Sequence, residues 1–251
     1  MSAPKKLFVT DIDGTFIRSS LLIELCYELI KRGIFPAEAK RDLSHTRDQW
    51  ERRQGEYEDY ILAVVDVYYH FIKGCSITDV NYIGKMVAEW QRFRVYCFTR
   101  DLITYFVNSD EYYCVAISGS PGPVVRPFAK MWGFDEVHCS EAAELDDGKF
   151  GDRTSFTFDG KDRIITEMIE KDNPPLILTE SVGMGDTNGD KSFLEMMTYP
   201  IAFNPELDFA RDILENKRLG SNWDIVVERK SVAWRDGKIT TASKWLREKR
   251  L

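Results

Sequence analysis

The chain has 251 residues, of which 43% are hydrophobic and 30% are charged, with a formal net charge of −7. This length and composition predict a globular protein with one large domain, or a core domain plus an insertion, and exclude a disordered chain. The acidic balance gives no general attraction to nucleic acid, so we expect no nucleic-acid partner.

The cysteines and histidines indicate neither disulfides nor zinc. Five cysteines are widely spaced without a Cys-X-X-Cys pair, and the three histidines lack ligand spacing, so we expect reduced thiols and no zinc site. The segment before the first apolar run is too short for a signal peptide, and no run approaches the roughly 18 apolar residues that span a bilayer. We therefore expect a soluble, cytoplasmic protein without a membrane partner; the sequence does not indicate its oligomeric state.

The first predicted strand, from Leu7, ends in Asp11-Ile12-Asp13-Gly14-Thr15. An apolar run without polar alternation is typical of a buried parallel strand, and Gly14 permits a sharp turn that can give the two acids different roles. One carboxylate could attack while the other moves a proton. The alternatives are an ordinary surface turn and a calcium loop, but Phe16 and Leu22 stand where a calcium loop needs glycine and glutamate.

The next segment, from about 17 to about 93, is predicted to be predominantly helical. Apolar residues at helical spacing predict helices over 21–32 and 57–73, each followed by glycine, and a further helix from Thr78 or Asp79 through Trp90. The charged stretch 36–54 lies between the first two.

A second buried strand is predicted at Tyr113–Ile117, after a helix at about 101–108. It stops at Ser118-Gly119-Ser120-Pro121-Gly122, where a helix over about 122–132 begins. Free N–H groups at a helix start can bind phosphate, so this turn is a candidate phosphate pocket. Taken alone, it could also be an ordinary strand-to-helix turn.

Lys161 lies at the start of a predicted helix, after a predicted hairpin over 138–158 that turns at Asp147-Gly148. A lysine beside the positive end of a helix is electrostatically out of place, which hints at an anionic partner. A solvated lysine is the alternative.

A third candidate site follows the predicted strand Leu176–Val182. Asp186 and Asp190 flank the start of a predicted helix that runs through Met197. Acids can serve there as helix caps, but the pair after a glycine-bearing strand favours a metal site. Beyond it we expect a strand over 200–203, a helix over 205–216, a last strand over 224–228, a turn at Asp236-Gly237 and a basic, solvated tail helix over 243–251. A regulatory or interface role for that tail is the alternative.

Alternating strands and helices predict an α/β fold with a doubly wound parallel sheet, which gathers functional groups at the carboxyl ends of its strands. Asp11, Asp13, Ser118 and Asp186 all follow apolar strands. With Lys161 they supply a nucleophile, an acid/base, a hydroxyl, a cation and metal-binding acids, which are the groups that phosphoryl transfer requires.

These motifs resemble the haloacid dehalogenase (HAD) superfamily of phosphatases. The resemblance lies in Asp-Ile-Asp-Gly-Thr, Ser118 after a strand, Lys161 at a helix start and Gly-Asp-Thr-Asn-Gly-Asp, in that order over most of the chain. The helical insertion after the first motif, the Asp147-Gly148 hairpin and Asn204-Pro205 look like the phosphoserine-phosphatase-like branch. The resemblance implies a Rossmann-like, HAD-like core over 1–16 and 94–251, with a helical cap domain inserted over 17–93.

The resemblance also implies residue roles. Asp11 would form an aspartyl-phosphate, and Asp13 would protonate the leaving alcohol and then activate water. Mg²⁺ would be held by Asp11, Asp186 and the backbone carbonyl of Asp13, with Asp190 orienting a metal-bound water or Lys161. The phosphoryl oxygens would be held by Ser118, the Gly119 N–H and Lys161.

The sequence departs from the phosphoserine enzymes at Ser20, where their substrate-gripping glutamate stands; Glu24, one turn further, is a possible substitute. Four arginines in the cap could bind an anionic leaving group, although a solvated helix face is the commoner role for such a run: Arg41, Arg47, Arg52 and Arg53. We expect a magnesium-dependent phosphatase acting on a small phosphorylated metabolite. The alternatives are a phosphotransferase or mutase with the same intermediate, and a catalytically silent phosphate-binding module.

Overall fold

The computed structural model describes residues 3–155, 157, 160–171, 173–218 and 222–251. Within these residues the strands form one nine-stranded sheet in the order β4-β3-β2-β1-β5-β6-β7-β8-β9. The strands are β1 (Lys5–Asp11), β2 (Tyr112–Pro121), β3 (Glu136–Glu144), β4 (Phe150–Ser155), β5 (Leu176–Gly185), β6 (Tyr199–Phe203), β7 (Asp224–Arg229), β8 (Val232–Arg235) and β9 (Lys238–Thr240). The six strands from β3 to β7 in this order run parallel, which confirms the predicted α/β fold.

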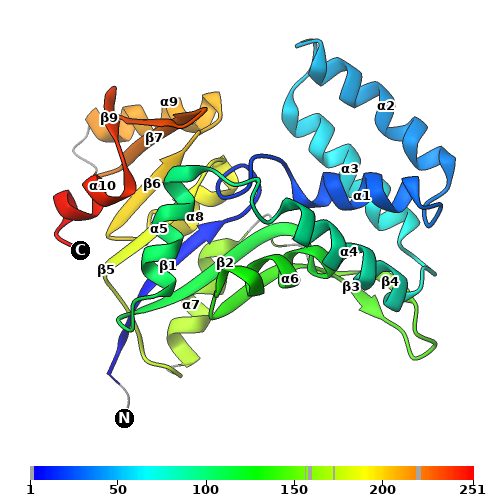
Figure 1. Ribbon diagram of the computed structural model, residues 1–251, viewed down its shortest axis with the longest axis horizontal. Helices are drawn as coiled ribbons and strands as arrows, with labels where there is room; N and C mark the ends of the chain where they lie inside the picture. The colour runs from blue at the N-terminus through cyan, green and yellow to red at the C-terminus, as the bar shows by residue number, and fades with distance from the viewer. Residues whose placement is uncertain (1–2, 156, 158–159, 172, 219–221) are drawn as a thin grey trace.

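Helices cover both faces of the sheet (Figure 1). One face packs against α5 (Cys97–Val107), α6 (Gly122–Trp132) and α10 (Ala242–Lys249), and the other against α7 (Lys161–Lys171), α8 (Lys191–Leu194) and α9 (Leu207–Arg218). In β1, Phe8 belongs to the first hydrophobic cluster while Leu7 and Val9 belong to the second, and all three are fully buried. Successive side chains of a strand point to opposite faces, so a strand buried on both sides has no polar alternation.

The predicted helical segment forms four helices, here called the cap helices: α1 (Leu21–Lys31), α2 (Ala37–Glu51), α3 (Tyr57–Phe71) and α4 (Ile77–Gln91). Figure 1 shows α2 and α3 extending beyond the sheet, while α4 lies beside α6. At that contact a Cβ on Gly84 would lie 2.3 Å from the carbonyl oxygen of Pro123, so only glycine allows this approach. The division into two domains at about 17 and 93 stays a prediction.

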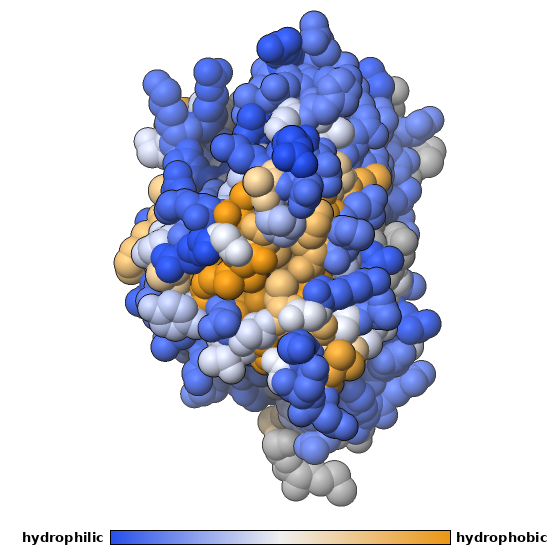
Figure 2. Space-filling view, turned by 90° about the vertical axis from the view of Figure 1, so that its right-hand side faces the viewer, coloured by the Kyte–Doolittle hydropathy of each residue, from blue (hydrophilic) through white to orange (hydrophobic). Residues whose placement is uncertain are grey.

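The chain between α3 and α4 is also joined to the β3–β4 hairpin by backbone hydrogen bonds. The Gly74 and Ile77 N–H groups donate to the carbonyls of Phe150 and Gly148, and the Phe150 N–H donates to Cys75. Figure 2 shows the side of the molecule that carries the cap helices and this hairpin, with hydrophobic residues gathered in the middle of a hydrophilic surround. The hairpin therefore supports the cap as well as extending the sheet.

Two predictions for the C-terminal part are wrong. β7 is not the last strand, because β8 and β9 add to the sheet as an antiparallel extension that turns at Asp236-Gly237. The tail helix α10 is not simply solvated: Trp245 is fully buried, its indole N–H donates to Asp224 (2.8 Å), and Lys249 pairs with the same carboxylate (2.8 Å). A single buried tryptophan in a short basic segment gives too weak a periodic pattern to reveal this packing.

Other differences concern element ends. α4 begins at Ile77 after a Ser76 N-cap, α5 begins four residues earlier than predicted, and the helix expected through Met197 ends at Leu194 after a short 3₁₀ turn (Asn188–Asp190). The predicted hairpin end, Phe158, lies outside the described residues. Within the described part of the chain, no helix has the length and apolar character needed to cross a membrane.

Candidate active site

The predicted site residues meet where three parallel strands end. β1 lies between β2 and β5, and Asp11 is its last residue. Ser118 and Gly119 lie in the final part of β2, and Asp186 follows directly after β5. After β1 the chain adds β2, β3 and β4 on one side of that strand and then crosses to add β5 on its other side. Ligands of doubly wound folds bind at this point, where the strand order reverses.

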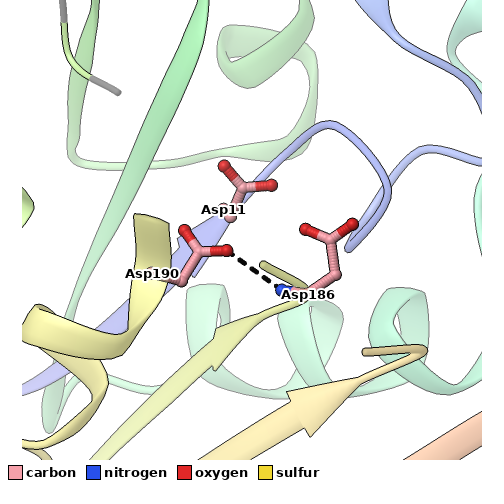
Figure 3. A group of neighbouring side chains, drawn as sticks. All are labelled: Asp11, Asp186 and Asp190. Carbon is pink, nitrogen blue, oxygen red and sulfur yellow. Dashed lines mark hydrogen bonds between the residues drawn. The ribbon is translucent and has the colours of Figure 1, made fainter. Parts of the chain in front are cut away.

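Lys161 joins two of the aspartates. Its Nζ lies 2.9 Å from Oδ1 of Asp11 and 2.5 Å from Oδ1 of Asp190, and all three side chains are buried. Figure 3 shows Asp11, Asp186 and Asp190 gathered around a common space. The helix-start lysine is therefore not solvated but neutralises acids from distant parts of the chain, and the anionic partner stays a prediction.

Asp190 has both of its oxygens engaged. Besides the contact with Lys161, its Oδ2 accepts hydrogen bonds from the N–H groups of Asp186 (3.0 Å) and Thr187 (3.1 Å) and from the Thr187 hydroxyl (3.2 Å). Figure 3 marks the first of these bonds. Asp190 is thus suited to hold the loop after β5 and to orient Lys161.

Asp13 is fixed by two donors of different origin. Its Oδ1 accepts from the Leu21 N–H (2.5 Å) at the start of α1, and its Oδ2 accepts from the Ser118 hydroxyl (2.8 Å). Ser118 is fully buried behind Asp13, and its Oγ also accepts from the Ser120 N–H (3.0 Å). In this arrangement Ser118 contacts the predicted acid/base, and its predicted contact with phosphate stays a prediction.

The N-terminus of α1 is directed at the site, a feature that the sequence analysis missed. Leu22 N–H donates to the Ser120 hydroxyl (2.9 Å), and Ile23 N–H donates to Ser20 (3.5 Å). Together with the bond from Leu21 to Asp13, the first N–H groups of this cap helix are satisfied by site residues. The Ser-X-Ser sequence at the end of β2 was the available signal, but the partner of its second serine depends on the fold.

Asp186 lies against the turn that follows Asp13. Its Oδ1 accepts from the Thr15 hydroxyl (3.1 Å), and a Cβ on Gly14 would lie 2.1 Å from its Oδ2. Gly14 also has a φ of +82°, a conformation that favours glycine. The Asp-Gly-Thr sequence thus brings the first and last motifs together.

Burial makes this group of acids costly to ionise. It raises the pKa of Asp11, Asp13 and Asp186, and the neighbouring carboxylates raise the pKa of Asp11 and Asp186 further. Burial alone would lower the pKa of Lys161, but Asp11 and Asp190 outweigh it and hold the pKa above its usual value. One ammonium group among these carboxylates leaves the site short of positive charge.

The residues fit a magnesium ion. Carboxylate oxygens of Asp11, Asp186 and Asp190 lie within 4.8 Å of one another, and in the described part of the structure Oδ2 of Asp11 is buried without a hydrogen-bond partner. A buried, unpaired carboxylate oxygen is unfavourable, and Mg²⁺ prefers oxygen ligands. Because Asp190 is fully engaged, Asp11 and Asp186 are the side chains that would hold the ion, which would screen negative charge on the substrate and the nucleophile.

A cavity of about 250 Å³ opens over these groups. Its polar floor is formed by the strand ends, the turn before α1, the start of α7 and the segments after β5 and β6: Asp11, Asp13, Ser20, Gly119, Ser120, Lys161, Asp186, Thr187, Asn188, Gly189 and Glu206. Its apolar wall consists of residues from the cap helices: Leu22, Tyr57, Ile61, Leu62 and Val65. Glu24 and the four cap arginines are not part of this lining; Arg47, for example, pairs with Asp48 (3.1 Å) on α2.

The family comparison agrees with this fold and site. The family described as haloacid dehalogenase-like hydrolase matches residues 8–195, a span that includes every predicted site residue. The chain belongs to this family of hydrolases. No curated protein matches it.

Solved structures share the fold at low sequence identity. A protein of unknown function from Bordetella pertussis Tohama I has a TM-score of 0.65 at 18% identity, over 89% of this chain and 98% of that one. A phospho-aspartyl intermediate analogue of phosphoserine phosphatase has a TM-score of 0.57 at 20% identity, over 91% and 96%. A substrate-bound phosphoserine phosphatase complex has a TM-score of 0.55 at 18% identity, over 86% and 99%. The fold is therefore that of phosphoserine-phosphatase-like members of the family.

Proposed function

We propose that this protein is a magnesium-dependent phosphatase that hydrolyses a small-molecule phosphomonoester through an aspartyl-phosphate on Asp11. The observation that carries the proposal is the position of Asp11 in the cavity floor, 2.9 Å from the Lys161 ammonium and beside Asp13. One structural neighbour is a phospho-aspartyl intermediate analogue of phosphoserine phosphatase, and this likeness supports the same role for Asp11.

In the first step a carboxylate oxygen of Asp11 attacks phosphorus and the bond from phosphorus to the alcohol oxygen breaks. Lys161 is placed to keep Asp11 ionised and to balance charge on the phosphoryl group. Asp13, whose pKa is raised by burial, gives its proton to the departing alkoxide. The products of this step are the free alcohol and phosphorylated Asp11.

In the second step Asp13, now ionised, removes a proton from water as the water oxygen attacks phosphorus. The bond from phosphorus to Asp11 breaks, which releases inorganic phosphate and restores both carboxyl groups. The two hydrogen bonds that Asp13 accepts, from Leu21 and Ser118, hold its carboxyl group in one orientation for both proton transfers. A bound Mg²⁺ would supply charge stabilisation for the phosphoryl group throughout.

The direct test is release of inorganic phosphate from a panel of phosphomonoesters by the purified chain with Mg²⁺, beside Asp11→Asn. We expect the substitution to lower kcat by about 10⁶-fold, the scale seen when a covalent nucleophile is removed. Asp146→Asn, at an exposed acid in the β3–β4 turn, is the matched control and should keep full activity. Undiminished turnover by a folded Asp11→Asn protein would refute the proposal.

Product analysis completes the test. Because a phosphotransferase would form the same intermediate, the released phosphate is measured against phosphorylated product in the presence of competing alcohols. We expect free phosphate to account for the substrate consumed. Ligand binding without turnover would instead support a phosphate-binding module.

A further inference from the structure

The cap residues that line the cavity are placed to contact the alcohol part of a phosphomonoester. They come mainly from one face of α3, at positions 57, 58, 61, 62 and 65, together with Leu22 of α1. This spacing places them on a single helix surface turned toward the polar floor. The wall therefore lies where the group beyond the phosphate must sit.

Part of this apolar wall lacks cover from the protein. Leu22 and Val65 are buried at 2% and 7% exposure, but Leu62 and Tyr57 remain 42% and 40% exposed. When a ligand covers exposed apolar side chains in a cavity, removal of their surface from water makes the free energy of binding more favourable. A polar or charged leaving group placed against these side chains would lose hydrogen bonds to water without replacing them.

The charges around the cavity oppose an anionic leaving group. Among the described residues of the lining, Lys161 carries the single positive charge, and it is already paired with Asp11 and Asp190. Glu58 and Glu206 add negative charge to the lining. The cap arginines that could have attracted an anion lie elsewhere, so nothing in the described lining offers a cation to a second acidic group.

We infer that the substrate is the phosphate monoester of an alcohol without a second acidic group, whose hydrocarbon part packs against Leu62 and its neighbours in the apolar wall. This inference rests on the proposed phosphatase function and names the substrate class of the same site. The cavity of about 250 Å³ accommodates a short alkyl or single-ring group with the phosphate on the floor.

The test measures kcat/KM for ethyl, butyl and hexyl phosphate, whose alcohols have similar acidity, beside phosphoserine and 3-phosphoglycerate. We expect kcat/KM to rise with chain length, by at most about fourfold for each methylene group that becomes fully buried. The two charged substrates should be poorer than butyl phosphate. Equal values for all alkyl phosphates, or a preference for a charged substrate, would overturn the inference.

A variant pair locates the effect. Leu62→Asn should lower kcat/KM for hexyl phosphate by roughly fivefold and that for ethyl phosphate by clearly less, because it removes apolar contact that the shorter chain makes only in part. Leu214→Asn is the matched control, since Leu214 is a similarly exposed leucine (51%) on α9 outside the lining. An equal loss for both esters in Leu62→Asn would contradict the assigned contact.

The two proposals fail in different ways. If Asp11-dependent release occurs with every ester but ignores chain length, the phosphatase function stands and the apolar substrate class falls. If no ester, including p-nitrophenyl phosphate, gives Asp11-dependent release, the phosphatase function itself falls.

Discussion

The polar floor and the apolar wall of the cavity are built in opposite ways. In the floor, Asp13 is held by Leu21 and Ser118, and Lys161 is held by Asp11 and Asp190, so these charged groups have little freedom. In the wall, Leu62 and Tyr57 remain partly exposed, although the Tyr57 ring also packs against Trp50 of α2. In the proposed function the floor carries both chemical steps, and we expect that side chains of the wall can be changed without disturbing them. The two proposals therefore assign reaction and specificity to separate parts of this molecule.

After the loss expected for Asp11→Asn, the largest effect that tests this division is expected at Asp13. Asp13→Asn should lower kcat for an alkyl phosphate by about 10²–10⁴-fold, because the alkoxide then leaves without a proton and water is no longer activated. With p-nitrophenyl phosphate, whose anion leaves unaided, we expect a burst of nitrophenol equal to the enzyme concentration, followed by slow turnover. Asp146→Asn should behave as the unaltered protein. Absence of the burst in a folded variant would contradict the assigned role.

Magnesium should stabilise the floor as well as activate it. At a concentration 100 times its Kd, Mg²⁺ should add about 2.7 kcal/mol to the free energy of unfolding, which corresponds to a rise in Tm of roughly 5–10 °C for a chain of this size. Thermal unfolding with Mg²⁺ or with EDTA measures the shift. Asp186→Asn should abolish most of it and also the activity. A shift of the same size in Asp186→Asn would show that the ion binds elsewhere.

Gly84 tests how the wall is placed over the floor. In Gly84→Ala the new Cβ meets the Pro123 carbonyl, a backbone group, so α4 must move away from α6. We expect a loss of about 1–3 kcal/mol in unfolding free energy and a weaker dependence of kcat/KM on alkyl chain length. Denaturant unfolding and the alkyl phosphate series measure the two effects. Gly55→Ala, whose Cβ would lie 3.2 Å from the Gln49 side chain, is the control and should change both little.

The smallest effect is expected at Glu58, on the exposed edge of the wall. Glu58→Gln should raise kcat/KM for 3-phosphoglycerate by no more than about fivefold, because an exposed charge is screened by water and salt. The gain should disappear at high ionic strength and should be absent for hexyl phosphate. Asp59→Asn, at the next exposed residue of α3 outside the lining, provides the comparison. An equal gain for both substrates would exclude an electrostatic origin.

Much of the fold followed from local patterns in the sequence. The apolar runs of β1, β2 and β5 predicted parallel strands because strands buried on both faces carry no polar alternation. The glycines after α1 and α3 marked helix ends correctly. The antiparallel strands β8 and β9 were missed because they are short and their pairing depends on β7 being present beside them.

The sequence by itself determined the chemical groups of the floor: Asp11, Asp13, Lys161 and Asp186 each follow a strand or begin a helix, and parallel strands bring such positions to one edge. Only the tertiary structure decided that Ser120 accepts the Leu22 N–H of α1, that Trp245 is buried and anchors the tail, and that α3 presents an apolar face with Leu62 to the site. The physical reason is the distance along the sequence over which the determining contacts act. A strand end is set by its own residues, whereas the surface a helix presents to a cavity depends on how distant helices pack, here α4 against α6 at Gly84. The groups proposed to carry the chemistry could therefore be predicted from the sequence, whereas the proposed kind of substrate could be inferred only from the packing of the cap.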